Sequence, residues 1–471
     1  MTDVAVIGFG PVGATLALLL AGQGLTVRVL DREPAAYHLP RAVHFDDEVM
    51  RIFQAAGVAA AVLPHTHVSP GTHFRAADGR LLMDWSRPMA VGPQGWHTSY
   101  RFHQPDLEAV LRAALATRPG VTIETGTEVT ALAQDAAGVS LGVAGGTRRA
   151  GFVIGCDGAR SFTRGIIGGG MEDLGFDERW LVVDVILRRP VPALGAHTVQ
   201  HCDPARPATY VRGVGERRRF EITLHPGEAP GDRLAETAVW PLLARWLGPE
   251  DAVLERAAVY TFRSAVARRW RDGRLLIAGD AAHLTPPFLG QGMCAGIRDA
   301  SNLAWKLARV VRGAAPEALL ETYQAERAPH ARAYIELAVR LGGLINTRAM
   351  AAALGREDPG EEPIRMASLA PALGGFAAPL GRPVPQPVLA DGTRLDDRIG
   401  HRFALLLRPG VAAPPGILAV ADPALLPWLV GLGAVAALVR PDRQLAGLAT
   451  NAAGIVALAQ ADGATTAPPS S

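Results

Sequence analysis

The apolar positions near the start of the chain fall into short runs that predict a strand, a turn, a helix and a second strand. Val4–Ile7 is a short apolar run, typical of a buried parallel strand. Ala14–Ala21 consists of helix-forming residues, and two glycines after it can end the helix. Val27–Leu30 is the next apolar run and closes at Asp31. The chain therefore opens with an α/β unit.

The pattern changes further along. We expect a helix over 106–116 and strands over 122–129 and 151–154. Between 180 and 268, short β-rich runs alternate with turn residues, which favours a mostly antiparallel sheet. The α/β pattern then returns, with a strand over Arg274–Ala278, a loop over 279–292, a helix over Met293–Arg312 and further helices to about residue 344.

The last quarter of the chain predicts a separate small domain. Residues 351–385 are rich in Gly, Pro and Ala, which indicates a linker. Strands over 403–407 and 435–439, with a helix over 425–430, predict a small α/β domain at 386–461. The tail at 462–471 has a composition typical of disorder.

Composition narrows the function classes. The 471 residues suggest two or three domains, and the net charge of +2 includes no basic block, so nucleic acid is not an expected partner. The three cysteines lie far apart without a CxxC, which predicts neither a disulfide framework nor a zinc site and fits the cytoplasm. No metal-ligand spacing is visible. Glycines and prolines interrupt the apolar runs, so no membrane segment is expected.

The turn after the first strand has the pattern Gly8-x-Gly10-x-x-Gly13. Gly8 permits the tight turn, Gly10 lets the backbone approach a pyrophosphate, and Gly13 lets the helix pack on the strand. The amides at the helix N-terminus then bind the anion. Asp31 closes the second strand, where a carboxylate can accept hydrogen bonds from a ribose. This context predicts a dinucleotide site.

Two later motifs add polar groups at strand ends. Gly279-Asp280 follows an apolar strand, and an acid there can meet a polyol chain. Gly290-Gln291-Gly292 precedes a helix, whose first amides can face a carbonyl or a developing anion. Gly155-Cys156-Asp157-Gly158 lies between these motifs and the first one.

The chain resembles the FAD-dependent aromatic hydroxylases, the single-component flavoprotein monooxygenases related to para-hydroxybenzoate hydroxylase, in three stretches that occur in this order: Gly8–Gly13, Gly155–Gly158 and Gly279–Gly292. The resemblance covers roughly residues 3–345 and includes Pro40-Arg41-Ala42, Gln104–Glu108 and Tyr323–Arg327. Within the family, the chain is most similar to the 3-(3-hydroxyphenyl)propionate hydroxylases, at Phe45–Glu48, Cys202–Pro207 and Val259–Thr261.

The resemblance implies a fold of class α/β plus β. A Rossmann-like FAD-binding domain would be interleaved with an antiparallel-sheet substrate domain, and a thioredoxin-like α/β domain would follow. The FAD-binding domain would comprise 1–72, 98–178 and 269–350, and the substrate domain 73–97 and 179–268. The thioredoxin-like domain, similar to relatives around Val439-Arg440-Pro441-Asp442, lacks a CxxC, so no redox role is expected for it.

The resemblance also implies which residues hold FAD. The pyrophosphate and adenosine would meet Gly8, Gly10, Pro11, Val12, Gly13, Asp31 and Arg32. The ribityl chain and the flavin ring would meet Arg41, Gln104, Gly279, Asp280, Pro287, Gly290, Gly292 and Met293. Asp157 belongs to a motif tied in the family to FAD and to the pyridine nucleotide.

The implied reaction uses NADPH or NADH, O2 and a small phenolic substrate. The nicotinamide reduces FAD, O2 forms a flavin C4a-hydroperoxide, and this species hydroxylates the ring. Only one GxGxxG has a strand before it and a helix after it, so the nicotinamide binds without a domain of its own. A homodimer is one option for the assembly.

Substrate contacts are predicted at a few positions. His44 is either a hydrogen-bonding partner that activates the phenol or a plain lining residue. Pro287 has no N–H to donate, so its carbonyl would shape the pocket. His201, Tyr210 and Arg212 lie in the β-rich region that would roof the substrate. Asp46 and Asp47 are either partners that support a site residue or the start of the next helix, where acids suit the dipole; the helix start is the favoured interpretation.

Two other functions remain open from the sequence. The same motifs would serve a tailoring hydroxylase or epoxidase of a larger aromatic natural product, since the pocket decides the substrate. A non-catalytic flavoprotein would also carry them. The favoured substrate is similar to 3-(3-hydroxyphenyl)propionate.

Overall fold

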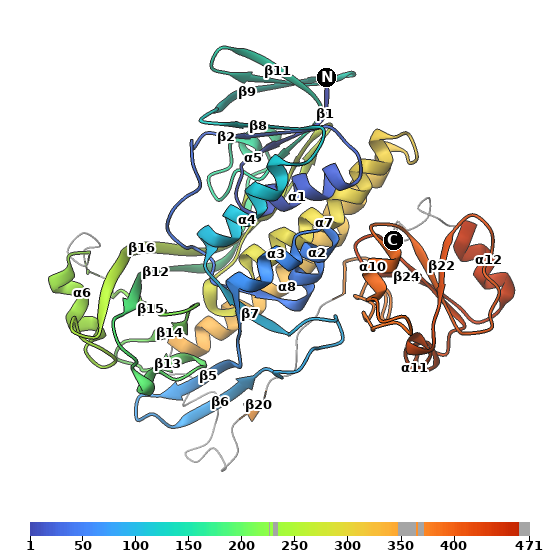
Figure 1. Cartoon of the computed structure of the whole chain (residues 1–471). Coiled ribbons are helices and arrows are strands. Elements are labelled where there is room, and N and C mark those ends of the chain that lie inside the picture. Colours follow the sequence, from blue (N-terminus) through green and yellow to red (C-terminus); the bar gives the residue numbers. More distant parts are fainter. Residues whose placement is uncertain (226, 229–233, 347–363, 366–371, 461–471) are drawn as a thin grey trace.

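The computed structural model describes residues 1–225, 227–228, 234–346, 364–365 and 372–460. The described chain forms an α/β unit, a larger sheet beside it and a small α/β unit near the C-terminus, drawn in orange and red in Figure 1. The predicted tail at 462–471 and most of the predicted linker lie outside the described residues.

The first sheet has β1 at its centre. Its eight strands in the described chain run in the order β17-β18-β11-β1-β2-β8, with β10 paired onto β11 and β9 paired onto β10. The side chains of Val4 and Val6 are fully buried, as the apolar run predicted. The strands are β1 (Thr2–Ile7), β2 (Val27–Asp31), β8 (Val121–Thr125), β9 (Val129–Asp135), β10 (Gly138–Val143), β11 (Gly146–Gly155), β17 (Arg271–Asp272) and β18 (Leu275–Ile277).

Helices pack against this sheet and against one another. Helix α1 (Pro11–Gly22) is buried continuously from Gly13 to Leu20, as a helix whose residues are apolar apart from Thr15 should be, and it contacts α7 (Gly292–Val311). The other helices before residue 347 are α2 (Asp47–Ala55), α3 (Ala59–Val62), α4 (Gln104–Ala116), α5 (Phe162–Ile167), α6 (Glu236–Leu243) and α8 (Glu321–Asn346).

The second sheet is built around two long antiparallel strands. Over the described residues, nine strands follow the order β19-β16-β12-β15-β14-β13-β5-β6-β20. The antiparallel pairing of β12, β14, β15 and β16 confirms the β-rich prediction for 180–268. The strands are β5 (Gly71–Ala76), β6 (Leu81–Ser86), β12 (Met171–Leu187), β13 (Thr198–Cys202), β14 (Ala208–Arg212), β15 (Arg217–Thr223), β16 (Ala252–Ala267), β19 (His283–Leu284) and β20 (Ile364–Arg365).

The two faces of the second sheet have different neighbours. We call the outer face the one that packs on α6, because Tyr210 and Phe220 share a buried cluster with Val239 of that helix. The inner face carries Phe74 and Trp180, which share another cluster with Phe288 and with Leu341 of α8. The inner face therefore looks toward the α/β unit.

A small third sheet connects these parts. Strand β7 (Ser99–Phe102) lies between β3 (His44–Asp46) and β4 (Thr66–Val68), with His44 opposite Arg101 and Phe45 opposite Tyr100. The Phe45 ring stacks on Tyr100 with 5.2 Å between the ring centroids.

The C-terminal unit confirms the strands predicted at 403–407 and 435–439. Its described part has the strand order β22-β21-β23-β24, with β21 (Ala404–Leu407), β22 (Leu418–Ala421), β23 (Ala436–Val439), β24 (Leu445–Ala449) and the helices α10 (Leu395–Ile399), α11 (Leu426–Gly431) and α12 (Ala452–Gln460). The buried Arg440 attaches it to α8, because its guanidinium lies 2.7 Å from the Glu326 carboxylate. A thioredoxin-like identity for this unit stays a prediction.

Two local predictions differ from the structure. The strand expected over 122–129 is split, because Gly126 at a φ of +66° turns the chain between β8 and β9. The loop expected over 279–292 contains short 3-10 turns at Gly279–Ala281 and Pro287–Leu289.

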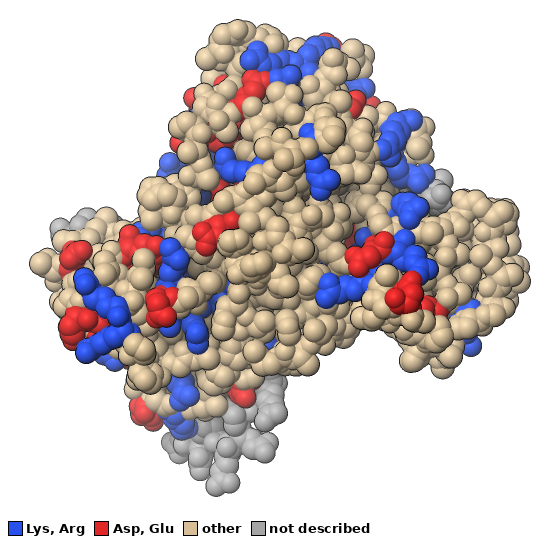
Figure 2. All heavy atoms as spheres, viewed as in Figure 1, with Lys and Arg blue, Asp and Glu red and all other residues tan. Residues whose placement is uncertain are grey.

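On the face shown in Figure 2, basic and acidic side chains are interspersed.

Candidate functional site

The glycine-rich turn after β1 leaves no room for side chains at two of its three glycines. Gly8 has a φ of +102°, and a Cβ there would lie 2.3 Å from the Cys156 carbonyl oxygen. A Cβ on Gly13 would lie 2.0 Å from the carbonyl oxygen of Gly8. Gly10 is different, because a Cβ built there meets no atom within 4 Å. The turn therefore packs on itself at Gly8 and Gly13 and is open at Gly10.

Asp31 at the end of β2 fixes the shape of this turn. Its Oδ2 accepts a hydrogen bond from the Phe9 amide at 2.6 Å, and its Oδ1 accepts one from the Glu33 amide at 2.8 Å. Each carboxylate oxygen has a further lone pair, so a ribose hydroxyl can still donate to it. Pro11 is the first residue of α1, where the missing N–H loses no helical bond. Arg32 has 70% of its side chain exposed and forms an ion pair with Glu33.

The strand end after β18 meets the same turn. Gly279 has a φ of +64°, and a Cβ there would lie 3.1 Å from the Val12 side chain. A Cβ on Gly296 of α7 would lie 2.6 Å from the same side chain. Val12 therefore wedges between two distant glycines. Asp280, next to Gly279, is exposed, and no hydrogen bond or ion pair from the described part of the chain reaches its carboxylate.

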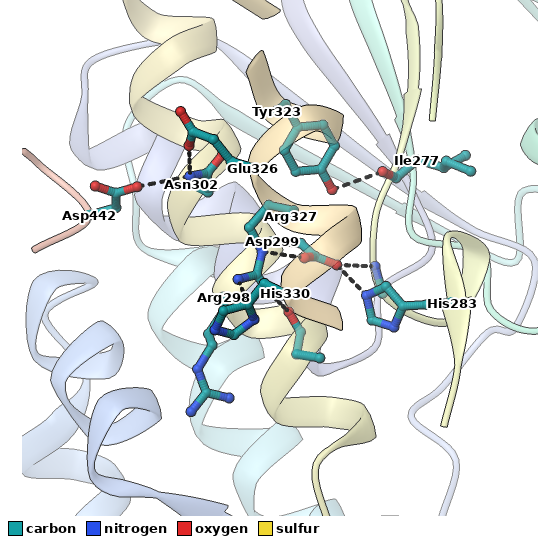
Figure 3. Close-up of polar contacts among 12 residues, drawn as sticks. Ile277, His283, Arg298, Asp299, Asn302, Tyr323, Glu326, Arg327, His330 and Asp442 are labelled. Atoms are coloured by element: carbon teal, nitrogen blue, oxygen red, sulfur yellow. Dashed lines mark hydrogen bonds and ion pairs between the residues drawn. The ribbon is translucent and has the colours of Figure 1, made fainter. Parts of the chain in front are cut away.

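A buried network that the sequence analysis missed holds the Gly279 loop (Figure 3). Asp299 on α7 is fully buried; it accepts hydrogen bonds from the Gly279 amide at 3.1 Å and from Arg327 Nε at 2.8 Å. His283 Nε2 lies 2.6 Å from the same carboxylate. Burial raises the pKa of Asp299, but His283 and Arg327 outweigh it and hold the pKa below its usual value. The charged carboxylate therefore anchors the loop that presents Asp280.

The N-terminus of α7 lies beside this loop. The turn before it is closed by a hydrogen bond from the Gly290 amide to the Pro287 carbonyl at 2.8 Å. A Cβ on Gly290, whose φ is +63°, would lie 3.0 Å from His44 Nδ1. The amides of Gly292 and Met293 start the helix, where N–H groups lack helical partners and the dipole favours an anion.

His44 lies on β3 against this turn and is uncharged. Its Nε2 is 3.0 Å from Ser99 Oγ, and its Nδ1 is 3.4 Å from the Gly290 carbonyl. Burial and the Arg101 guanidinium lower the pKa of His44 to about 3, although Asp46 acts in the other direction. A neutral imidazole can donate one hydrogen bond and accept another.

Gln104 positions the loop that carries Arg41. Its Oε1 accepts hydrogen bonds from the amides of Arg41 at 3.0 Å and Ala42 at 2.8 Å. Its Nε2 donates to Glu108 at 2.7 Å. The side-chain amide of Gln104 is therefore occupied by hydrogen bonds within the protein. The Arg41 side chain is exposed and lies over the Tyr37 ring, so of these two residues Arg41 is the one whose side chain is available to a ligand.

Two predicted acids form caps. Asp157 accepts hydrogen bonds from the Thr163 amide at 2.9 Å and from Ser161 Oγ, so it holds the start of α5. Asp46 caps α2 by accepting a hydrogen bond from the Val49 amide at 3.1 Å, which confirms its interpretation as a helix start.

The predicted substrate residues do not gather at His44. His201 and Tyr210 lie on the outer face of the second sheet, where they line a cavity of about 250 Å³. Trp246 Nε1 donates to His201 Nε2 at 3.2 Å there. Arg212 ends β14 two residues after Tyr210, on the same side. The inner face carries Gln200 instead, and strand alternation alone leaves undetermined which face is covered. The substrate roles of His201, Tyr210 and Arg212 stay predictions.

The residues around Val12 fit FAD. The open space at Gly10 suits a pyrophosphate that accepts hydrogen bonds from backbone amides. The unpartnered Asp280 carboxylate suits the hydroxyls of a ribityl chain, and the α7 N-terminus suits the electron-accepting edge of a flavin. In FAD, the pyrophosphate, the ribityl chain and the flavin ring follow one another in the same order as Gly10, Asp280 and the α7 N-terminus in this site.

The comparison with known proteins decides the family. Residues 1–338 match the family described as FAD binding domain. The chain belongs to this FAD-binding family. A probable NADH-specific resorcinol 4-hydroxylase of Rhodococcus jostii is 40% identical over 97% of this chain and 94% of its own length. A 3-(3-hydroxyphenyl)propionate/3-hydroxycinnamic acid hydroxylase of Mycolicibacterium smegmatis is 37% identical over 86% of this chain and 76% of its own.

Solved structures agree with this family. Aklavinone-11 hydroxylase, crystallised with FAD and aklavinone, is 25% identical and superposes with a TM-score of 0.78 over 98% of both chains. Anhydrotetracycline hydroxylase from Streptomyces rimosus is 26% identical, with a TM-score of 0.74 over 97% of this chain and 98% of its own.

These relatives confirm several predictions for this FAD-binding protein. The resemblance to FAD-dependent aromatic hydroxylases, the fold class, the flavin cofactor and the oxidoreductase activity are confirmed. No helix in the described ranges is long and apolar enough to cross a membrane. The domain boundaries, the homodimer and the cytoplasmic location stay predictions.

Proposed function

We propose that this chain is an FAD-dependent monooxygenase that uses NADH and O2 to hydroxylate a phenol carrying a second substituent meta to its hydroxyl group. Resorcinol and 3-(3-hydroxyphenyl)propionate, named for the relatives at 40% and 37% identity, share this meta pattern. The observation that carries the proposal is the convergence of the Gly10 turn, Asp280 and the α7 N-terminus at Val12, beside the neutral His44.

The chain's own residues would hold the cofactor by charge complementarity. The amides after Gly10 would bind the pyrophosphate, Asp31 the ribose, and Asp280 the ribityl hydroxyls. When bound, the flavin supplies the redox chemistry, accepting electrons from NADH and activating O2 for transfer to the ring. The amides of Gly292 and Met293 would stabilise negative charge at the flavin edge, an interaction worth about 0.3–1 kcal/mol at an exposed helix end and more when buried.

The substrate would lie between the inner face of the second sheet and the α7 N-terminus. Gln200 and Thr209 are buried there and hydrogen-bonded to each other at 2.6 Å, so they offer a fixed polar surface to a ring hydroxyl. His44, held by Ser99 and Gly290, offers a second hydrogen-bonding group. Together they would orient the ring, and the surrounding buried aromatic side chains would exclude water.

The test is a substrate panel with the purified, FAD-supplemented protein. We would measure NADH and NADPH consumption with resorcinol, 3-(3-hydroxyphenyl)propionate and a polycyclic aromatic such as aklavinone, and identify hydroxylated products. We expect a meta-substituted phenol to stimulate NADH consumption and to gain one oxygen atom. Stimulation by the polycyclic aromatic alone would favour a natural-product tailoring enzyme, and a bound flavin with no stimulated turnover would favour a non-catalytic flavoprotein.

A further inference from the structure

Arg101 is a buried cation without a counter-ion. It lies on β7 directly opposite His44, and only 8% of the residue is exposed. Its guanidinium donates a hydrogen bond to Thr198 Oγ1 on the inner face of the second sheet. No carboxylate in the described part of the chain lies within ion-pair distance of it. The Glu221 carboxylate interacts electrostatically with Arg101 from beyond ion-pair distance, and its Oε1 lies 3.9 Å from Nη1 of Arg219.

Every other buried arginine of the described chain has such a partner. The carboxylate partners are Asp396 for Arg51 and Arg443, Asp184 for Arg219 and Arg256, Asp46 for Arg298, Asp299 for Arg327 and Glu326 for Arg440. Burying a charge without a partner is costly, which is why buried charges are usually paired. Burial accordingly lowers the pKa of Arg101 to about 10, although the guanidinium stays charged near neutral pH.

The position of Arg101 indicates what its partner is. The third sheet places it beside His44, and its bond to Thr198 places it at the inner face that carries Gln200. The ligand that would lie between these elements is the phenol of the proposed function. The substrate therefore supplies the missing anion if it binds in its deprotonated form.

We propose that Arg101 binds the phenolate oxygen of the substrate. The assignment rests on the proposed function, and it favours the ring oxygen over a carboxylate because resorcinol and 3-(3-hydroxyphenyl)propionate share only the phenolic group. On binding, the O–H bond of the phenol breaks, the electron pair stays on the oxygen, and the proton leaves to solvent. The neutral His44 is too weak a base to retain that proton.

The charged and titratable groups that interact with Arg101 support this assignment. They are His44, His67, Glu221 and Arg219. Burial, together with nearby arginines, lowers the pKa of His44 and of His67, so both rings are neutral and neither competes for an anion. Burial also raises the pKa of Glu221. A phenolate would thus meet the guanidinium of Arg101, which no carboxylate of the described chain neutralises at ion-pair distance, and this charge favours the deprotonated form.

The experiment compares Arg101→Gln and Arg101→Lys with a matched control, Arg75→Gln, on the outer face. Among the described residues, the side chain of Arg75 has one hydrogen bond, to the Gly79 carbonyl in its own hairpin, and it lines the cavity on the outer face, away from Arg101 and His44. Each protein is prepared with FAD, and its flavin content and thermal unfolding are measured first. Dissociation constants for resorcinol, 3-(3-hydroxyphenyl)propionate and 3-phenylpropionate, which lacks the hydroxyl group, are then measured from the flavin absorbance change. Proton release on binding is measured with an indicator dye.

We expect Arg101→Gln to weaken the binding of both phenols by about 10- to 100-fold, because one charge-assisted hydrogen bond is lost. The variant should also abolish proton release on binding. Arg101→Lys should keep part of the affinity, and Arg75→Gln should behave as wild type. The affinity of Arg101→Gln for 3-phenylpropionate should not fall, because this compound lacks the hydroxyl group. The thermal midpoint of the variant should not fall either, because the substitution removes an unpaired charge.

Three results would overturn the assignment. Unchanged phenol affinity in Arg101→Gln would remove Arg101 from the site. Loss confined to the two propionates would assign Arg101 to a carboxylate. A flavin-loaded wild-type protein that binds no phenol would refute the proposed function itself, a failure distinct from the first two because it appears before any substitution.

Discussion

The three glycines of the first turn should respond differently to substitution, and Gly10 is the informative one. Its φ of −79° and ψ of −174° suit any residue, and its Cβ position is empty. Gly10→Ala should therefore leave the cofactor-free fold intact, and it should raise the free energy of unfolding by about 0.4–1 kcal/mol, because alanine restricts the unfolded chain. The methyl group would occupy the space that a pyrophosphate needs. If the pyrophosphate loses two charge-assisted hydrogen bonds to the amides of this turn, the affinity for FAD should fall by at least about 100-fold.

The matched comparison is Gly13→Ala, whose Cβ would lie 2.0 Å from the backbone oxygen of Gly8. Backbone atoms cannot rotate away, so this variant should lose about 1–3 kcal/mol or more of stability even without cofactor. Urea unfolding of the cofactor-free proteins and titration with FAD, followed by flavin fluorescence, separate the two effects. If Gly10→Ala bound FAD like wild type, or unfolded as readily as Gly13→Ala, the reasoning about this turn would be refuted.

Other residues give sharper single tests. Asp280→Asn should weaken FAD about tenfold without changing cofactor-free stability, since the carboxylate has no partner among the described residues; unaltered affinity in the same titration would remove its ribityl role. Glu326→Gln should cost about 3–5 kcal/mol in urea unfolding, because Lys306 and Arg440 lose their shared counter-ion, whereas the exposed Glu33→Gln should cost almost nothing. The pKa of His44 is lowered to about 3 in the folded protein from 6.5 in the unfolded chain. The free energy of unfolding should therefore decrease as the pH falls from 6.5 toward 3, by up to about 1.4 kcal/mol per pH unit. His44→Gln should flatten this slope, and an unchanged slope would contradict the lowered pKa of His44.

Local patterns predicted the parts of the fold that local physics decides. The apolar run at Val4–Ile7, the glycine spacing and Asp31 each lie within one strand–turn–helix unit, and the structure has β1, α1 and β2 there. The convergence of Gly279-Asp280 with the first turn could be predicted only through the family resemblance. No periodicity shows that Val12 fits between two glycines more than 260 residues away.

The substrate side was less predictable for a physical reason. Strand alternation shows that Tyr210 and Arg212 share a face, but which face is covered depends on α6 and on the turn at Phe288, both distant in sequence. Arg101 and Asp299 were missed because their importance lies in partners brought by other elements. An arginine between two buried aromatic residues, and an aspartate within a buried helix, were the available signals.

The Val12 wedge has a consequence for biosynthesis. The two glycines that clasp it lie at positions 279 and 296, so a nascent chain that has emerged only as far as the second sheet has the Gly10 turn without its counterpart. The flavin can be retained only after α7 has left the ribosome and docked on α1, although domains commonly begin folding from the N-terminus during synthesis. Ribosome-stalled chains of increasing length should therefore acquire flavin in a single late step.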